Sequence, residues 1–277
     1  MSIRTNRFPI PRVIVPQHIL ASVHDDDKPH LPSLITGILE INPNATFYST
    51  GGTGKVLVQA LGEERAKKQY IPVERFTGVP EMEGGLVKTL VPGIHAGILG
   101  ERGNPTHIEY LTEILPREEA ERLVQTWGEI IKELQRDFQF STSQINEVGL
   151  LERLQIGLTR PPFVYFDLLI NSFYPFERTL EQEGTTAEDA RANTDIGGPS
   201  MVTGAAKNWH SIAVLTDNSQ YERFLEEVRT NRGIPIELRF ELAREATRRV
   251  ADYREAIAGH MKGLTLEKAL EGLTIQD

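Results

Sequence analysis

Four short runs of apolar, β-branched and aromatic residues alternate with longer segments of helical spacing, and this alternation limits the fold more than any other feature. The runs lie at 18–23, 45–49, 163–171 and 211–216. Strands separated by helices pair in parallel, because each helix returns the chain to the same end of the sheet. We therefore expect an α/β domain with a mainly parallel sheet.

Two segments, 116–138 and 236–261, have the spacing of long amphipathic helices. Their apolar stripes consist of Leu123, Trp127, Ile130, Ile131, Leu134 and Phe138 in the first segment, and of Leu238, Leu242, Ala246, Val250, Tyr253, Ile257 and Met261 in the second. We expect both stripes to pack against the core or a second subunit rather than to hold a cofactor.

Charge and composition exclude several classes of protein. The net charge is −9 and the pI is about 5.4, so we expect neither nucleic acid nor an anionic membrane as a partner. The chain has no cysteine, which excludes disulfides, thiolate metal sites and a cysteine nucleophile. There is no signal-peptide pattern, and no stretch approaches about 18 consecutive apolar residues. We expect a cytoplasmic protein.

An acidic cluster, Asp25, Asp26 and Asp27, lies between His24 and His30 and suggests a metal site. Adjacent carboxylates do not point to one centre, however, and no ligand spacing recurs elsewhere. We expect a solvated acidic turn and no metal.

The glycine-rich motif STGGTGK, at 49–55, follows a β-rich run and opens a helical segment. Glycines let the backbone approach an anion, hydroxyls donate to it, and a helix N-terminus adds partial positive charge. The motif is not a P-loop, because Ser49 replaces the first glycine and Val56 the hydroxyl residue. A tight strand-to-helix turn explains the motif equally well.

Lys88, in the motif GGLVKTL, is flanked by Val87 and Leu90. It is either a partly buried cation suited to proton transfer or a surface lysine. Tyr174 follows the run at 163–171, at the end of a strand where open α/β sheets bind ligands. The alternative for Tyr174 is an interface aromatic.

Asp195 precedes Gly197 and Gly198, and Lys207 follows twelve residues after it. These groups could converge on one substrate. A capped helix start explains the acid and the glycines equally well.

In their order along the chain, seven motifs resemble the inosine-monophosphate cyclohydrolase domain of the bifunctional transformylase/cyclohydrolase family of purine biosynthesis. They are STGGT, TGVPEM, GGLVKTL, HAGIL, YPFE, NTDIGGPSM and AAKN. The resemblance covers 18–261 with one large interruption. It implies a single methylglyoxal-synthase-like domain over 1–277, with a helical insertion at 106–160 and a helical C-terminal extension at 235–277. We expect no transformylase domain, and therefore a separate formyltransferase.

The family reaction is a dehydration that closes the ring of 5-formamidoimidazole-4-carboxamide ribonucleotide to give inosine monophosphate, and it uses no cofactor. By resemblance, the catalytic residues are Lys88, Tyr174, Asp195 and Lys207. Asp195 with one lysine would manage the amide proton, and Tyr174 with the other lysine would stabilise the formyl oxygen. The nucleotide substrate would be bound by Thr50, Gly51, Gly52, Thr53 and Thr89 at its phosphate and by Ser172, Ile196, Gly197 and Gly198 at its base.

Three positions depart from the family pattern, and cationic groups at the phosphate end are thereby lost or reversed in sign. Leu86 replaces an arginine, His24 a serine and Asp26 a lysine. Either other basic residues replace the lost charges or the ligand is not the standard nucleotide. The candidate replacements are Lys28, Arg102, Arg117 and Arg160.

Three hypotheses follow from these observations. The first is a monofunctional inosine-monophosphate cyclohydrolase, and the second a related ring-closing enzyme with a different nucleotide-like substrate. The third is a non-catalytic nucleotide-binding relative. The apolar stripes and the family precedent favour a homodimer in each case.

Overall fold

The computed structural model describes residues 8–79, 88–118, 162–173, 176–181 and 183–273, with five further helical positions between 121 and 136. Most of the stripe expected at 116–138, and most of the insertion at 106–160, lie outside the described residues. The candidate catalytic residue Tyr174 also lies outside them.

Five parallel strands form the main sheet in the order β4–β3–β2–β5–β6. Their bounds are Tyr70–Pro72 for β4, Thr46–Ser49 for β3, His18–Ser22 for β2, Leu168–Asn171 for β5 and Ala213–Leu215 for β6. The expected α/β fold with a mainly parallel sheet is confirmed. β4 falls outside the four expected runs, because three residues are too few to produce a periodic pattern.

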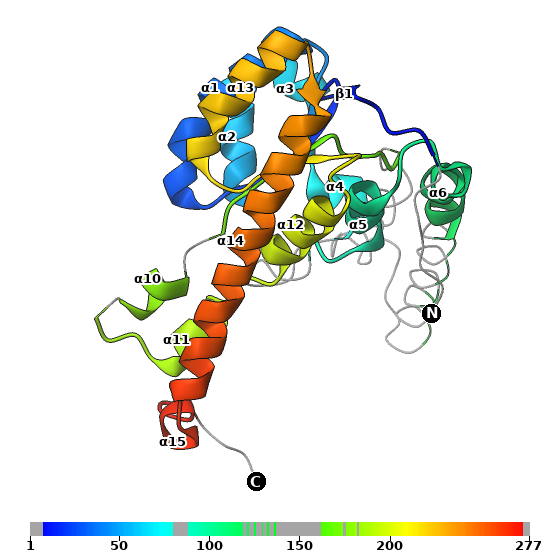
Figure 1. The fold of residues 1–277 in the computed structure, drawn as a ribbon. Helices are drawn as coiled ribbons and strands as arrows, with labels where there is room; N and C mark the ends of the chain where they lie inside the picture. The colour runs from blue at the N-terminus through cyan, green and yellow to red at the C-terminus, as the bar shows by residue number, and fades with distance from the viewer. Residues whose placement is uncertain are drawn as a thin grey trace.

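Helices cover both faces of this sheet (Figure 1). On one face lie α1 (Leu31–Ile41), α2 (Gly51–Leu61) and α13 (Tyr221–Asn231), and on the other lie α5 (Pro92–Leu99), α12 (Gly197–Lys207) and part of α14 (Ile236–Gly263). The shorter helices are α3 (Glu63–Gln69), α4 (Val73–Thr77), α6 (Pro105–Glu109), α10 (Phe176–Leu180), α11 (Ala187–Ala192) and α15 (Leu266–Ala269). Short helical turns occur at Asp25–His30 (η1), Tyr110–Ile114 (η3) and Asn218–Gln220 (η4), and β1 (Val13–Ile14) pairs antiparallel with β7 (Ile234–Pro235).

The strands are buried on both faces, so successive residues enter different hydrophobic clusters. In β5, Leu169 packs with α5, α12 and α14, whereas Leu168 and Ile170 pack with α1, α2 and α13. This double burial explains why the strands are continuous apolar runs rather than alternating patterns.

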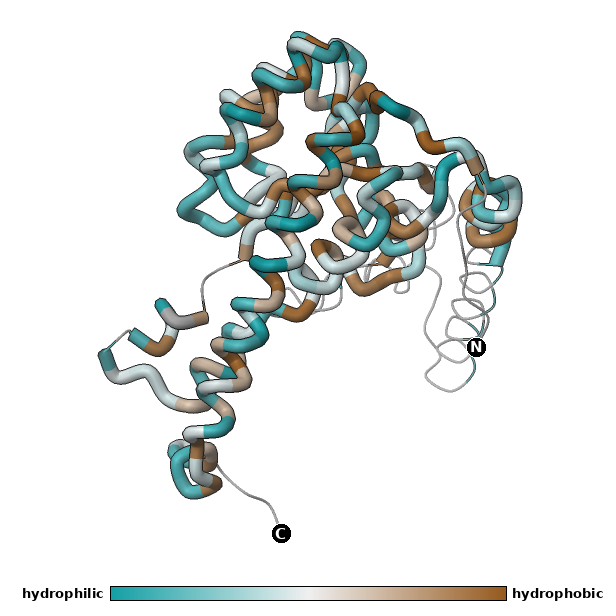
Figure 2. The backbone as a smooth tube through the Cα atoms, in the orientation of Figure 1, coloured by the Kyte–Doolittle hydropathy of each residue, from teal (hydrophilic) through white to brown (hydrophobic). Residues whose placement is uncertain are grey.

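The helix α14 carries the apolar stripe expected at 236–261, and Figure 2 shows the alternation of hydrophobic and hydrophilic residues along it. Its first half covers the sheet, and its second half extends beyond the sheet beside α10, α11 and α15 (Figure 1). Val250 and Tyr253 are buried, whereas Met261 near its end is 62% exposed. Among the described helices, including α14, none combines the length and apolar character that crossing a bilayer requires.

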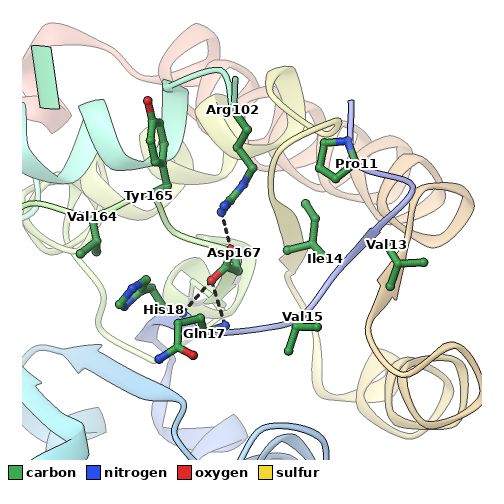
Figure 3. A pocket seen from close by; sticks show the side chains of 10 residues that line it. All are labelled: Pro11, Val13, Ile14, Val15, Gln17, His18, Arg102, Val164, Tyr165 and Asp167. Atoms are coloured by element: carbon green, nitrogen blue, oxygen red, sulfur yellow. Dashed lines mark hydrogen bonds and ion pairs between the residues drawn. The ribbon is translucent and has the colours of Figure 1, made fainter. Parts of the chain in front are cut away.

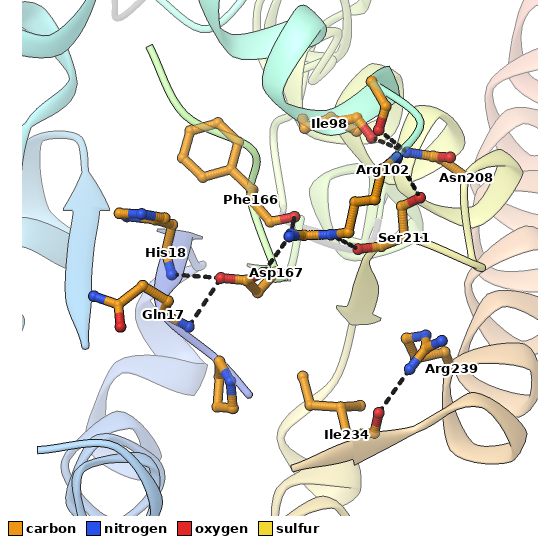
Figure 4. A network of polar contacts seen from close by, with 12 residues as sticks. Gln17, His18, Ile98, Arg102, Phe166, Asp167, Asn208, Ser211, Ile234 and Arg239 are labelled. Atoms are coloured by element: carbon orange, nitrogen blue, oxygen red, sulfur yellow. Dashed lines mark hydrogen bonds and ion pairs between the residues drawn. The ribbon is translucent and has the colours of Figure 1, made fainter. Parts of the chain in front are cut away.

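An ion pair between Asp167 and Arg102 holds the amino edge of the sheet together (Figures 3 and 4). The buried Asp167 carboxylate also accepts hydrogen bonds from the backbone N–H groups of Gln17 and His18, at 2.9 and 2.7 Å. A cavity of about 530 Å³ lies beside these residues. The network joins the start of β2 to the start of β5.

A second arginine at this edge, Arg239 of α14, is fully buried (Figure 4). Its guanidinium donates to the carbonyl oxygens of Ile234 at 2.7 Å, Pro11 at 2.6 Å and Trp209 at 3.2 Å. Burial lowers the pKa of Arg239 to about 10. Arg239 therefore ties the N-terminal segment to β7 and to the connection between α12 and β6.

Candidate functional site

The glycine-rich motif forms the expected strand–turn–helix at the carboxyl edge of the sheet. β3 ends at Ser49, Thr50 is the N-cap residue, and α2 begins at Gly51. Gly51 has φ +39°, which favours glycine, and both Gly51 and Gly52 are exposed. In the described part of the chain the Thr50 side chain makes no cap hydrogen bond. The first N–H groups of α2 are therefore available to an anion.

Thr53, also in this motif, holds the fold together. Its hydroxyl accepts a hydrogen bond from the N–H of Val23 at 3.0 Å and lies 3.2 Å from the Val23 carbonyl oxygen, to which it donates. The side chain thus joins the first turn of α2 to the end of β2, so Thr53 can offer a ligand only its backbone.

Two lysines converge on this helix N-terminus. The Nζ atom of Lys28 lies 2.5 Å from the point that a Cβ of residue 52 would occupy, and Nζ of Lys88 lies 3.9 Å from the corresponding point at Gly51. Both side chains are half-buried. Positive charge beside the positive end of a helix favours an anion at this position, although Asp25 already neutralises part of the charge of Lys28.

The three aspartates of η1 point to three different partners. Asp25 pairs with Lys28, Asp26 pairs with Arg178 at 2.8 Å, and Asp27 accepts from the Nδ2 of Asn218 at 2.5 Å. Asp26, which replaces a family lysine, is thus neutralised by Arg178 of α10. This divergence of carboxylates agrees with the expected acidic turn.

Asp195 lies just before α12, whose first turn packs beside Asn171 at the end of β5. One carboxylate oxygen accepts from the N–H of Gly198 at 3.0 Å, and the backbone N–H of Asp195 donates to the hydroxyl of Tyr253 at 2.8 Å. Burial raises the pKa of Asp195 above its ordinary value, while the N–H groups of Gly198 and Gly197 and the charge of Lys88 act in the opposite direction. Lys88 thus lies near Gly51, and its charge also acts on Asp195.

Thr89 packs against the first turn of α12. It is buried, and its Oγ1 lies 2.6 Å from the point that a Cβ of Gly197 would occupy. The half-buried ring of His95 interacts with the backbone of Thr89, and burial lowers the pKa of His95. The segment that carries Lys88 is therefore anchored beside Asp195.

Asn171 is a polar residue at this edge that the sequence reasoning missed. It is the last residue of β5, is buried, and donates from Nδ2 to the carbonyl oxygen of Ser22 at 2.9 Å. Its Oδ1 has no hydrogen-bond partner in the described part of the chain and lies 2.9 Å from the Cβ position of Gly198. Ser172, the next residue, accepts from the N–H of His24 at 3.0 Å. The sequence signal that could have identified Asn171 is its position as the polar last residue of a buried apolar strand.

The structure brings together most of the expected site residues. They are Thr50, Gly51, Gly52, Thr53, Lys88, Thr89, Ser172, Asp195, Gly197 and Gly198. Ile196 adjoins them, and its side chain is 60% exposed.

Lys207 does not join this cluster within one chain. It is exposed at the last position of α12, whose eleven residues span about 15 Å from Gly197. Two side chains twelve residues apart can meet only where the chain folds back on itself. Between Asp195 and Lys207 the chain instead forms the helix α12, which keeps them apart.

The structure also reduces the number of basic residues that could replace the cations lost at the phosphate end. Lys28 is at the N-terminus of α2, whereas Arg102 is wrong as a candidate, because it pairs with Asp167 at the opposite, amino edge of the sheet. Arg117 is exposed on a helix that follows η3. Leu86 and Arg160 lie outside the described residues.

The fold and this edge define an α/β domain that presents two helix N-termini, two lysines and a half-buried acid to one small region. This arrangement suits a small anionic ligand with a polar, uncharged group at its other end.

Comparison of the chain with known proteins relates it to a family of purine biosynthesis enzymes. Residues 205–276 match the family described as the AICARFT/IMPCHase bienzyme. The chain is 33% identical over 248 residues to the bifunctional purine biosynthesis protein PurH of Magnetococcus marinus, and 33% identical over 255 residues to PurH of Prochlorococcus marinus. These alignments cover 89% and 91% of the chain but only 36% and 38% of the relatives, so the chain spans little more than a third of the curated relatives it matches.

The chain is thus a partial homologue of the PurH proteins, and the resemblance to the cyclohydrolase domain of that family is confirmed. The crystal structure of ForH has the same fold, with 24% identity and a TM-score of 0.56 over 87% of this chain and 95% of that chain.

Proposed function

We propose that this protein closes the purine ring by dehydrating 5-formamidoimidazole-4-carboxamide ribonucleotide to inosine monophosphate. Two observations carry the proposal: Nζ of Lys88 lies 3.9 Å from the Cβ position of Gly51, and the charge of Lys88 acts on the pKa of Asp195. A phosphate at the first site would place the heterocycle of the nucleotide toward the second. The family relationship supports the same reaction.

The phosphate would be held by the N–H groups of Gly51 and Gly52 and by the ammonium group of Lys28. Lys28 would thereby replace the lysine that the family pattern has at position 26. The Asp25 carboxylate would compete with the phosphate for Lys28, but it is 80% exposed and weakly held.

The ring closes when the carboxamide nitrogen attacks the formyl carbon. One proton from that nitrogen and one from the formamide nitrogen leave with the formyl oxygen as water, so no oxidant or other reactant is needed. Asp195 would accept the amide proton, and its raised pKa makes it a better base than an exposed aspartate. Lys88 and Tyr174 would stabilise the formyl oxygen as negative charge develops on it.

Lys207 has no role in this scheme within one chain, because it lies at the far end of α12. A separate formyltransferase would supply the substrate. A homodimer would cover the exposed apolar residues of α14 and α15, among them Met261 and Leu266.

The test is ring closure followed by the absorbance of inosine monophosphate, with purified protein and the formamido ribonucleotide. We expect turnover that falls by about 10²–10⁴-fold in Lys88→Met and in Asp195→Asn. Lys67→Met is the matched control, because Lys67 is an exposed lysine of α3 paired with Glu63 and Glu64. Wild-type rates in Lys88→Met would refute the assignment of Lys88.

A further inference from the structure

Oδ1 of Asn171 and Oδ2 of Asp195 lie beside the same point in the first turn of α12. A Cβ added at Gly198 would lie closest to Oδ2 of Asp195, and Oδ1 of Asn171 is 2.9 Å from the same position. The other oxygen of Asp195 accepts the hydrogen bond from the N–H of Gly198 at 3.0 Å. When Asp195 is ionised, the two oxygens at this point are therefore both acceptors.

The other end of the Asn171 amide determines which of its atoms lies at this point. Nδ2 donates to the carbonyl oxygen of Ser22 at 2.9 Å, and a turned amide would lose this bond and place an acceptor against that carbonyl oxygen. The atom directed at α12 is thus Oδ1, which is buried and has no hydrogen-bond partner among the described residues. A buried acceptor without a donor costs free energy.

A proton on Asp195 would supply the missing donor, because a protonated carboxyl group has an O–H and a carboxylate has none. Burial favours this form and raises the pKa of Asp195. The ammonium group of Lys88 and the N–H groups of Gly197 and Gly198 favour the anion instead. From α14, the Tyr253 hydroxyl accepts from the backbone N–H of Asp195. Asn171 therefore adds to the effect of burial and opposes that of Lys88.

We propose that Asn171 is a positioning residue whose Oδ1 accepts a hydrogen bond from Oδ2 of the protonated Asp195. The catalytic part of this role rests on the proposed function. When the carboxamide nitrogen loses a proton, its N–H bond breaks, an O–H bond forms on Asp195, and the neutral acid becomes the donor that Oδ1 lacks. Asn171 thereby stabilises the form of Asp195 that proton transfer produces, and it makes Asp195 a stronger base without touching the substrate.

Carboxyl NMR titration of the free protein tests this pairing without any turnover. Asn171→Leu keeps a similar volume and removes the amide, and we expect it to lower the pKa of Asp195, because the protonated acid loses its acceptor. The matched control is Asn208→Leu, since Asn208 is also buried and donates to the carbonyl oxygen of Ile98 at 2.7 Å, but lies at the far end of α12. It should leave that pKa unchanged. An unchanged pKa in Asn171→Leu overturns the proposal, and so does a raised one, which would show that the amide donates to the carboxylate.

Urea unfolding of Asp195→Asn gives a second test, which does not require Asn171→Leu to fold. The new amide would be a permanent donor to Oδ1 of Asn171. In the wild-type protein, the raised pKa of Asp195 means that stability present at low pH is lost as the pH rises through that pKa. We therefore expect Asp195→Asn to unfold at a higher urea concentration than the wild type at about pH 8, and at nearly the same concentration at about pH 4. A lower urea concentration at about pH 8 overturns the pairing.

The pH profile of ring closure measures the catalytic part of the role. Asn171→Leu should lower kcat by about tenfold and move the acidic limb of the profile to lower pH, whereas Asn208→Leu should do neither. An acidic limb that stays in place in Asn171→Leu overturns the role of Asn171 in catalysis. If the wild-type protein does not turn the substrate over, the proposed function fails, and the titration and the unfolding curves still decide whether Asn171 and Asp195 are paired.

Discussion

Replacing Lys28 with methionine tests whether the N-terminus of α2 is a phosphate site. Lys28 directs its ammonium group at Gly52, and its side chain is 24% exposed. Methionine preserves most of the length and packing of the side chain and removes only the charge. We therefore expect a loss of affinity for nucleotides with little change in stability.

The magnitude follows from the position of Lys28. A charge-assisted hydrogen bond contributes about 1.5–3 kcal/mol net. Asp25 already pairs with Lys28 and is 80% exposed, so it offsets only a small part of the gain on binding phosphate. The net loss in Lys28→Met should be about 2 kcal/mol, or about 30-fold in Kd. Asp25→Asn should change affinity in the opposite direction, by up to about fivefold.

The assay is calorimetry with 5-aminoimidazole-4-carboxamide ribonucleotide and with the corresponding nucleoside, which lacks the phosphate. The Lys28→Met effect should appear with the nucleotide and disappear with the nucleoside. It should also shrink as salt is raised, because a partly exposed charge is screened. An equal loss of affinity for both ligands would show that Lys28 does not bind the phosphate and would refute the reasoning.

Three further outcomes follow from the same contacts. Lys88→Gln should raise the pKa of Asp195, since the charge of Lys88 lowers it, and carboxyl NMR titration of the free protein measures the shift. Arg239→Met should lower the free energy of unfolding, measured in urea, by about 3–5 kcal/mol, because buried backbone carbonyl oxygens lose their donor. The control Arg229→Met, which removes an exposed ion pair, should lower it by less than about 1 kcal/mol. Gly198→Ala should cost about 1–3 kcal/mol and slow ring closure, because the added methyl would collide with the Asp195 carboxylate; an unchanged rate would contradict the placement of that acid.

The sequence predicted those parts of the fold that local patterns determine. β2, β3, β5 and β6 lie within the four apolar runs, because strands buried on both faces need continuous apolar sequence. The turn after β3 was predictable from its glycines, since Gly51 has a positive φ. The helix α14 was predictable from the apolar stripe at 236–261. The sequence did not show that Met261, at the end of this stripe, is exposed.

The sequence could not show which charged residues share an edge of the sheet. Lys28 and Arg102 were equal candidates for the phosphate end, yet they lie at opposite edges. The spacing between Asp195 and Lys207 suggested convergence, but a helix of eleven residues separates its ends. Asn171 attracted no attention, because one polar residue after an apolar run is ordinary until its partners are known.

The charged groups at the two edges of the sheet differ in the partners that they have within the protein. At the amino edge, the charged groups of Asp167 and Arg239 have hydrogen-bond partners within the protein, whereas the uncharged hydroxyl of Tyr165 is buried without a partner among the described residues. At the carboxyl edge, Arg249 has a buried Nε and Asn171 a buried Oδ1 without partners among the described residues, and Lys28 points at a helix N-terminus. Burial of polar groups is costly unless they are paired. We therefore expect a ligand at the carboxyl edge that accepts hydrogen bonds from Lys28, and a protonated Asp195 that donates one to Asn171, and the calorimetric effect of Lys28→Met measures the first of these contacts.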